Sequence, residues 1–305
     1  MRPTRRSQAN ILATLLAMVT AGCSATGLAP SSSGAPVDHS EVPPTMAGSS
    51  PLPDSISGTF DVGGHALYLE CEGTAEPTVV YMHGSIEHRD VVPHENGRPF
   101  IDALKDEHRV CVYDRRNVGA SDIVDAPQLP EDAIGEMRAL LQAAGVEPPY
   151  VLLGASFGGL LAYLYLNTYP DEVVGAVMLD SMFPDEMALE SMFPLEDRYE
   201  AFSEEDEGTG LERISHYKVQ MAAQAFIGRE PDIPLTYLAS IPEGFDVNDY
   251  GRPEYDRKVI EAQRAFVDRF APGTYVRVDA PHFMEPAIPG QIAEALREVI
   301  AQAGY

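Results

Sequence analysis

Positive charge is scarce in this sequence. Only 21 of its 305 residues are Lys or Arg, against 47 Asp or Glu, so the formal net charge is −26 at pH 7. A surface this acidic repels phosphate backbones and anionic lipid headgroups, and we therefore expect no nucleic-acid partner. A solvated surface accounts for the charge without any specific acidic function.

Several cofactor and metal motifs are also missing. The sequence contains no G-x-G-x-x-G and no P-loop pattern, so we expect no nucleotide cofactor. His88 and His94 lie near several carboxylates, but their spacing matches no helical pair of metal ligands and their loop holds no Cys. We therefore predict that the protein uses no cofactor and binds no metal.

The N-terminal residues have the features of an export signal. Three Arg among the first six residues precede an apolar run over 11–19, which is too short to cross a bilayer comfortably, and small residues follow. We predict a signal peptide over 1–22. The ending from Thr20 to Cys23 resembles a bacterial lipobox, with Thr20 in place of the usual Leu. The resemblance implies an exported lipoprotein whose only membrane contact is a lipid at Cys23. An ordinary cleaved signal and a secreted product are the alternative.

Cysteine is rare, with three residues in the chain. Export would leave Cys71 and Cys111 in an oxidising compartment, where a disulfide is permissible. Both lie on expected strands, so a bond requires that these strands be neighbours. Two buried thiols are the alternative.

Residues 23–57 are rich in Ser, Gly, Pro and Ala without helical or strand periodicity, which predicts a flexible tether. From residue 58 onward, short apolar runs alternate with helical patterns. This alternation predicts an α/β domain over 58–305, with a mostly parallel sheet covered by helices on both faces. The expected strands are 67–71, 79–82, 109–113, 150–153, 173–179, 235–238 and 275–278.

Residues 181–232 interrupt this alternation and are too many for one crossover helix. They are rich in Met and Phe and include an acidic run at 204–207. We expect an inserted helical lid, whose adaptable apolar side chains suit acyl or other hydrophobic groups. The alternative is that these side chains only pack the lid onto the body.

A G-x-S-x-G motif follows the expected strand at 150–153. It spans Gly154 to Gly158 and precedes a helical pattern. In this context the tight turn exposes the Ser156 oxygen and directs the backbone N–H of Phe157 at a developing oxyanion. Ser156 is therefore the candidate nucleophile. A glycine-rich turn with an idle serine is the alternative.

This motif and others resemble the α/β-hydrolase family, in the family's order. The strand at 79–82 leads into His83-Gly84-Ser85, which implies that the backbone N–H groups of Ser85 and Phe157 form the oxyanion hole. His83 is structural by this resemblance. A second match runs from 113 to 122, where Asn117 replaces the usual Gly and tolerates positive φ. The family's strand order also places Cys71 and Cys111 on adjacent strands.

A serine nucleophile needs a base, and the family order is nucleophile, acid, histidine. His282 is the His that follows the last expected strand, so it is the candidate base. Asp180 ends the strand at 173–179 and is the favoured acid. Glu243 and Asp246, after the following strand, are the alternatives.

These residues predict a serine hydrolase of the α/β-hydrolase fold. A carboxylesterase acting on small to medium hydrophobic esters through an acyl-enzyme is our first interpretation. One alternative is a peptidase of the proline-iminopeptidase kind. The other is a catalytically silent protein of the same fold that binds a ligand or partner.

Overall fold

The computed structural model describes part of the chain. The chain divides into two units, Met1–Ser49 and Ser50–Tyr305. The described residues all belong to the second unit and are 53–88, 91–193, 208, 210–241 and 253–305. The predicted signal peptide, Cys23, the tether up to residue 52, and the alternative acids Glu243 and Asp246 lie outside them.

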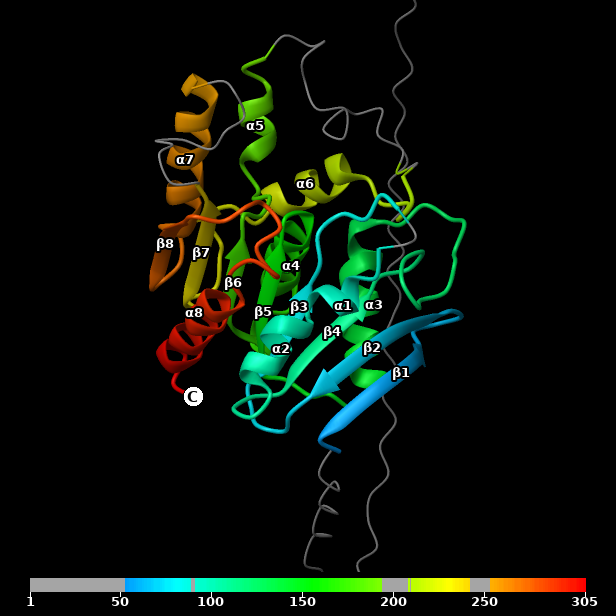
Figure 1. Ribbon diagram of the computed structural model, residues 1–305. Coiled ribbons are helices and arrows are strands. Elements are labelled where there is room, and N and C mark those ends of the chain that lie inside the picture. Colours follow the sequence, from blue (N-terminus) through cyan, green and yellow to red (C-terminus); the bar gives the residue numbers. More distant parts are fainter. Residues whose placement is uncertain (1–52, 89–90, 194–207, 209, 242–252) are drawn as a thin grey trace, which may run out of the picture. The chain divides into compact units, whose positions relative to one another are not determined.

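The described residues form one eight-stranded sheet (Figure 1) with the strand order β1-β2-β4-β3-β5-β6-β7-β8. β1 and β2 pair antiparallel, β2 and β4 also pair antiparallel, and the remaining neighbours are parallel. The strands are β1 (Ser55–Asp61), β2 (Ala66–Glu72), β3 (Thr78–Met82), β4 (Val110–Asp114), β5 (Tyr150–Ala155), β6 (Val173–Leu179), β7 (Leu235–Ser240) and β8 (Gly273–Val278).

The expected α/β class with a mostly parallel sheet is confirmed. Each strand expected from residue 67 onward is present, with ends shifted by up to two residues. β1 was not expected, and it begins at Ser55, inside the predicted tether. β1 is an edge strand in which only Ile56 is buried, so its composition does not indicate a strand. Its backbone is ordered by hydrogen bonds to β2.

Helices cover both faces of the sheet. Neighbouring residues of a strand point to opposite faces, so Val80 and Leu152 join the apolar cluster that contains α3, α4 and α7 side chains. Val79 and Val151 join the cluster that contains α2 and α8 side chains. The helices are α1 (Pro93–Asn96), α2 (Arg98–Leu104), α3 (Pro130–Ala143), α4 (Phe157–Thr168), the 3-10 helix η1 (Pro170–Glu172), α5 (Glu186–Glu190), α6 (His216–Gln224), α7 (Pro253–Val267) and α8 (Pro289–Gln302).

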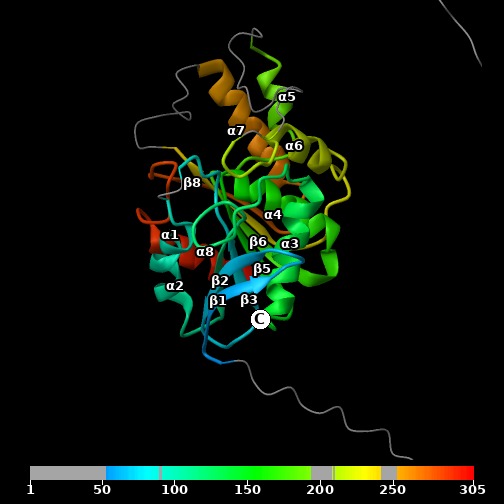
Figure 2. The ribbon, with the colours of Figure 1, turned by 90° about the vertical axis from the view of Figure 1, so that its right-hand side faces the viewer.

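The described parts of the predicted lid are α5 and α6, since residues 194–207 and 209 lie outside the description. Figures 1 and 2 both show α5, α6 and α7 together at one end of the sheet. α7 follows β7 and was not part of the predicted lid. It contacts the α5 region through Tyr255, whose hydroxyl donates to Glu190 at 3.0 Å and whose ring lies 4.6 Å from that of Phe193. In the part of the chain that is described, no helix has the length and apolarity needed to cross a membrane.

A disulfide joins Cys71 on β2 to Cys111 on β4. The two residues lie directly opposite each other in the antiparallel pair, and both are fully buried. The bond closes a loop over a sequence separation of 40 residues and ties the antiparallel edge of the sheet to its parallel part.

We expect the double variant Cys71→Ser/Cys111→Ser to lower the free energy of unfolding by about 2–4 kcal/mol, because removing the bond restores the conformational entropy of the unfolded chain. Urea unfolding followed by circular dichroism measures the difference. Reduction of the wild type should produce the same change, and a wild type that reductant leaves unaltered in stability would contradict the prediction.

Candidate active site

Ser156 lies at the sharp turn between β5 and α4. Its backbone has φ 50° and ψ −124°, which few non-glycine residues adopt. Two glycines make this geometry possible: a Cβ on Gly158 would lie 2.0 Å from the carbonyl oxygen of Met82, and one on Gly154 would lie 2.5 Å from the Cα of Gly159. The turn therefore needs glycine at both positions that the motif predicted.

The structure brings His282 and Asp180 together, although 102 residues separate them. His282 Nδ1 lies 2.7 Å from Asp180 Oδ2, and the other carboxylate oxygen of Asp180 accepts the Ser240 N–H at 3.2 Å. Asp180 follows β6 with φ 37°, and its own N–H donates to Leu238 O. The carboxylate is thus held from two sides and orients the His282 ring.

Hydrogen bonding to Asp180 raises the pKa of His282 above its usual value of 6.5. Burial acts in the opposite direction, while the negative charges of Asp180 and Glu285 add to the increase. The imidazolium form of His282 is therefore stabilised by its surroundings.

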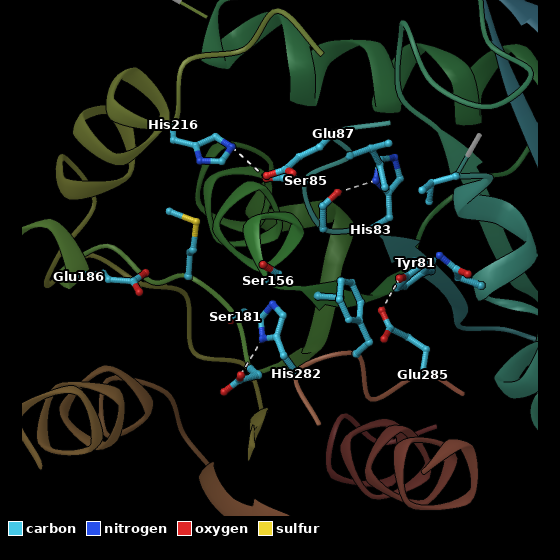
Figure 3. A pocket seen from close by; sticks show the side chains of 18 of the residues that line it. Tyr81, His83, Ser85, Glu87, Ser156, Ser181, Glu186, His216, His282 and Glu285 are labelled. Atoms are coloured by element: carbon cyan, nitrogen blue, oxygen red, sulfur yellow. Dashed lines mark hydrogen bonds and ion pairs between the residues drawn. The ribbon is translucent and has the colours of Figure 1, made fainter. Parts of the chain in front are cut away.

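Ser156 and His282 both line the same cavity, and Figure 3 shows them there together. In the described part of the chain, which includes both residues, no hydrogen bond joins Ser156 Oγ to His282 Nε2. In enzymes without bound substrate such bonds are often long and shorten only in the reacting complex. The arrangement supplies a candidate nucleophile, a base and an orienting carboxylate at one site.

The cavity has a volume of about 930 Å³. Part of its wall is apolar and comes from Met182, Phe193 and Phe283, and another part is acidic, with Glu186 and Glu190 on α5. Among the described residues, no Lys or Arg lines it. The site therefore offers apolar contact area together with negative charge.

The two predicted oxyanion donors belong to segments that lie next to Ser156. Phe157 is the first residue of α4, so its N–H has no acceptor within the helix and points from the positive end of the helix dipole. Ser85 lies in the loop after β3. A Cβ on Gly84 would lie 3.1 Å from Ser156 Cβ, which shows how closely this loop packs against the candidate nucleophile.

His83 is buried, with both ring nitrogens engaged. Nδ1 lies 2.7 Å from Gly84 O, and Nε2 accepts the Arg115 N–H at 3.3 Å. Burial, together with the charge of Arg115, lowers the pKa of His83 well below 6.5. His83 therefore stays neutral and holds the loop, in agreement with the structural role that the resemblance implied.

A buried ion pair beside this loop could not be found from the sequence. Arg115, in the turn after β4, donates through Nε to Glu212 at 2.6 Å, and Glu212 belongs to the predicted lid. Arg115 also donates to His83 O at 2.6 Å and to Gly84 O at 2.7 Å. The pair spans 97 residues, and no spacing rule connects such distant positions.

A second buried pair also joins distant residues. The Tyr81 hydroxyl donates to Glu285 at 2.6 Å, and both side chains line the cavity. Burial, followed by the charge of Glu285, raises the pKa of Tyr81 well above 10. Tyr81 is therefore a neutral donor, and Glu285 contributes negative charge near His282.

The two histidines considered as metal ligands lie in different surroundings. His88 lines the cavity, whereas the His94 ring lies 2.8 Å from Asp114 Oδ2. In the described ranges, no group of three or more His, Cys, Asp or Glu side chains has an arrangement that could hold a metal ion.

Comparison with known proteins relates this fold and site to one family. The model of the alpha/beta hydrolase fold family matches residues 77–221. The uncharacterized protein YqjL of Bacillus subtilis is 27% identical over 128 residues, which cover 42% of this chain and 49% of YqjL. A proline iminopeptidase of Lactobacillus helveticus is 30% identical over 135 residues, which cover 41% of this chain and 43% of that enzyme. The match thus spans less than half the length of each relative.

Solved structures share the fold over a larger part of the chain. A thermophilic esterase from Thermogutta terrifontis superposes with a TM-score of 0.53 at 18% identity, over 82% of this chain and 99% of the esterase. Identity this low concerns the fold alone. The matched residues and the sheet topology together show that this chain has the α/β-hydrolase fold.

Proposed function

We propose that the protein is a serine hydrolase that cleaves an acyl bond through an acyl-enzyme. The observation that carries this proposal is the convergence of three groups on one cavity: Ser156 on its strained turn, His282, and the Asp180 carboxylate that holds the His282 ring at 2.7 Å. This is the arrangement that activates a serine hydroxyl, which is otherwise a poor nucleophile.

In the proposed reaction, Ser156 Oγ attacks the acyl carbonyl while His282 Nε2 takes its proton. Asp180 keeps the other ring nitrogen protonated and stabilises the imidazolium. The backbone N–H groups of Ser85 and Phe157 donate hydrogen bonds to the oxyanion, and His282 then protonates the leaving group. Water releases the acyl group through the same base, which returns the proton to Ser156.

An ester with a small to medium hydrophobic acyl group is our first choice of substrate. Met182, Phe193 and Phe283 give the cavity apolar surface, and its volume of about 930 Å³ suits a ligand of that size. A serine nucleophile also favours acyl transfer over the dehalogenase and epoxide-hydrolase chemistries known for this fold.

The proposal is tested with p-nitrophenyl esters of increasing acyl length. We expect the wild type to turn them over and to react with a fluorophosphonate probe, and Ser156→Ala to lose both properties because the nucleophile is gone. The chain-length profile measures the acyl pocket. A wild type that neither hydrolyses an ester nor reacts with the probe would favour a silent, ligand-binding protein of this fold.

The raised pKa of His282 predicts a specific pH profile. His282 acts as a base only when neutral, so kcat/KM should fall as the pH drops through the pKa of His282, with a midpoint above 6.5. Asp180→Asn removes the first cause of the shift. We expect it to move this midpoint to lower pH and to reduce kcat by roughly 10³–10⁴-fold, since the ring loses its orienting anion.

Rates measured from pH 5 to 9 for both proteins provide the comparison. Asp171→Asn is the matched control, because it makes the same change at an exposed carboxylate of η1 that does not line the cavity. If the midpoint of the pH profile is the same in Asp180→Asn as in the wild type, another group causes the fall of kcat/KM at low pH.

A second candidate substrate class is an amide with a free amine, and Glu186 favours it. Its carboxylate oxygen Oε2 is buried in the cavity wall, and within the described residues it has no hydrogen-bond partner. Burial, with the charges of Glu190 and Asp180, raises the pKa of Glu186 to about 8. A bound ammonium group would supply the missing partner. The proline iminopeptidase of Lactobacillus helveticus is named for such chemistry.

Proline 2-naphthylamide separates the two substrate classes. If the amine reading holds, Glu186→Gln should reduce kcat/KM for this amide by at least about 10-fold, the value of one lost charged contact, and leave an uncharged ester unaffected. Wild-type turnover of esters without turnover of the amide would reject this second candidate.

We also propose that the protein is exported and held at the cell envelope by a lipid on Cys23. The disulfide between Cys71 and Cys111 supports an oxidising compartment. In the producing cell, Cys23→Ser should move the protein from the membrane fraction to the soluble fraction. Equal distribution of both forms would argue for an ordinary cleaved signal.

A further inference from the structure

Two stretches of chain meet beside the candidate nucleophile. One is the oxyanion loop, residues 83–86, and the other is the lid strap, residues 212–216, which leads into α6. Glu212 Oε1 accepts the Ile86 N–H at 2.7 Å. The same carboxylate holds Arg115, which in turn donates to the carbonyl oxygens of His83 and Gly84. The lid strap therefore fixes the two ends of the oxyanion loop.

His216, the last residue of the lid strap, contacts the middle of the loop. Its Nε2 lies 2.9 Å from Ser85 Oγ. Its ring stacks on that of Phe157, with a centroid distance of 4.0 Å and an interplanar angle of 26°. Figure 3 shows His216 and Ser85 joined at the rim of the cavity, above Ser156. One imidazole thus touches the side chains of both residues whose N–H groups are the oxyanion donors.

Packing alone does not hold Ser85. Its side chain is exposed, and the hydrogen bonds that hold the rest of the loop go to the carbonyl oxygens of His83 and Gly84 and to the Ile86 N–H. The hydrogen bond to His216 is the polar contact that ties this side chain to the lid. Phe157, by contrast, is buried and fixed at the start of α4. Arg115 holds the peptide unit that carries the Ser85 N–H through Gly84 O, and the anchor shared with Phe157 adds a second restraint on where this N–H lies relative to the Phe157 N–H.

We propose that His216 is a positioning residue, which aligns the two N–H groups of the oxyanion hole through Ser85 and Phe157. The inference rests on the proposed function, because an oxyanion hole matters only if acyl transfer occurs. The stabilisation of a developing oxyanion depends on donors already in place, so a loose Ser85 lowers the rate of the chemical step. In this proposal His216 acts through Ser85 and Phe157, and the proton transfer remains with His282.

The test compares an oxygen ester with the thiono ester of the same acid and alcohol. The sulfur of a thiono ester accepts hydrogen bonds weakly, so the ratio of the two kcat/KM values reports how well the oxyanion donors are placed. His216→Phe keeps a stacked ring and removes the hydrogen bond to Ser85. We expect its kcat for the oxygen ester to fall by about 10- to 100-fold, less than removal of a whole donor. KM and the thiono ester rate should change little, so the ratio falls.

Two further variants sharpen the result. Ser85→Ala removes the same hydrogen bond from the other side, should lower the ratio equally, and should add nothing to His216→Phe in the double variant. Met221→Ala lies on an exposed position of α6 and should leave the ratio at the wild-type value. If His216→Phe fails to fold by circular dichroism, Ser85→Ala alone tests the hydrogen bond.

The outcomes are distinguishable from those of the proposed function. A wild type that reacts with fluorophosphonate and hydrolyses esters, with an unchanged ratio in His216→Phe and Ser85→Ala, would overturn the inference and leave the proposed function intact. A lowered ratio in both variants supports it. A wild type with neither labelling nor turnover would overturn the proposed function, and the inference with it.

Discussion

The close approach of β3 and β5 at their carboxyl ends determines where Ser156 and the two predicted oxyanion donors lie. Met82 pairs with Gly154 at the end of the parallel ladder, and both chains turn soon after this point, β3 into the oxyanion loop and β5 into α4. Gly158 packs against the carbonyl oxygens of Met82 and His83, with no room for a Cβ. Ser156 is pushed outward into the cavity as a result, and the loop after β3 is brought against it.

The second constraint is the burial of charge next to this contact. Arg115 and Glu212 are both almost fully buried, and loss of one partner of a buried ion pair costs about 3–5 kcal/mol because the other charge remains unpaired. The pair lies where the turn after β4, the oxyanion loop and the lid strap meet. Its geometry specifies how α6 sits on the body, which packing of apolar side chains alone would define less sharply.

The sequence predicted the parts of this site that depend on local chain geometry. The strands are continuous apolar runs, and the turn at Ser156 has a glycine wherever a side chain would collide, so both leave a local pattern. Asn117 is another case: it adopts φ 73° where the family's turn has Gly, and its side chain accepts the Val124 N–H. Such features need only neighbours in the chain.

Asp180, His216 and Glu212 illustrate the limit of that approach. Three carboxylates were compatible with the chain order. The structure places Asp180 Oδ2 2.7 Å from His282 Nδ1, and the alternatives Glu243 and Asp246 lie outside the described residues. His216 and Glu212 lie in a lid whose composition indicates only apolar packing. Their partners, Ser85 and Ile86, are 131 and 126 residues away in the sequence. No local pattern encodes such contacts, because they arise when α6 docks on the sheet.

The negative charge of the cavity favours release of the acid that the proposed reaction produces. Hydrolysis of an ester produces a carboxylate, and in this cavity the product would face Glu190 and Glu285, with no Lys or Arg among the described lining residues. Like charges at such distances repel, which favours release of the acid. The same negative field stabilises the imidazolium of His282 while the neutral substrate reacts. The acidic lining thus favours the charged state of the base during catalysis and opposes retention of an anionic product.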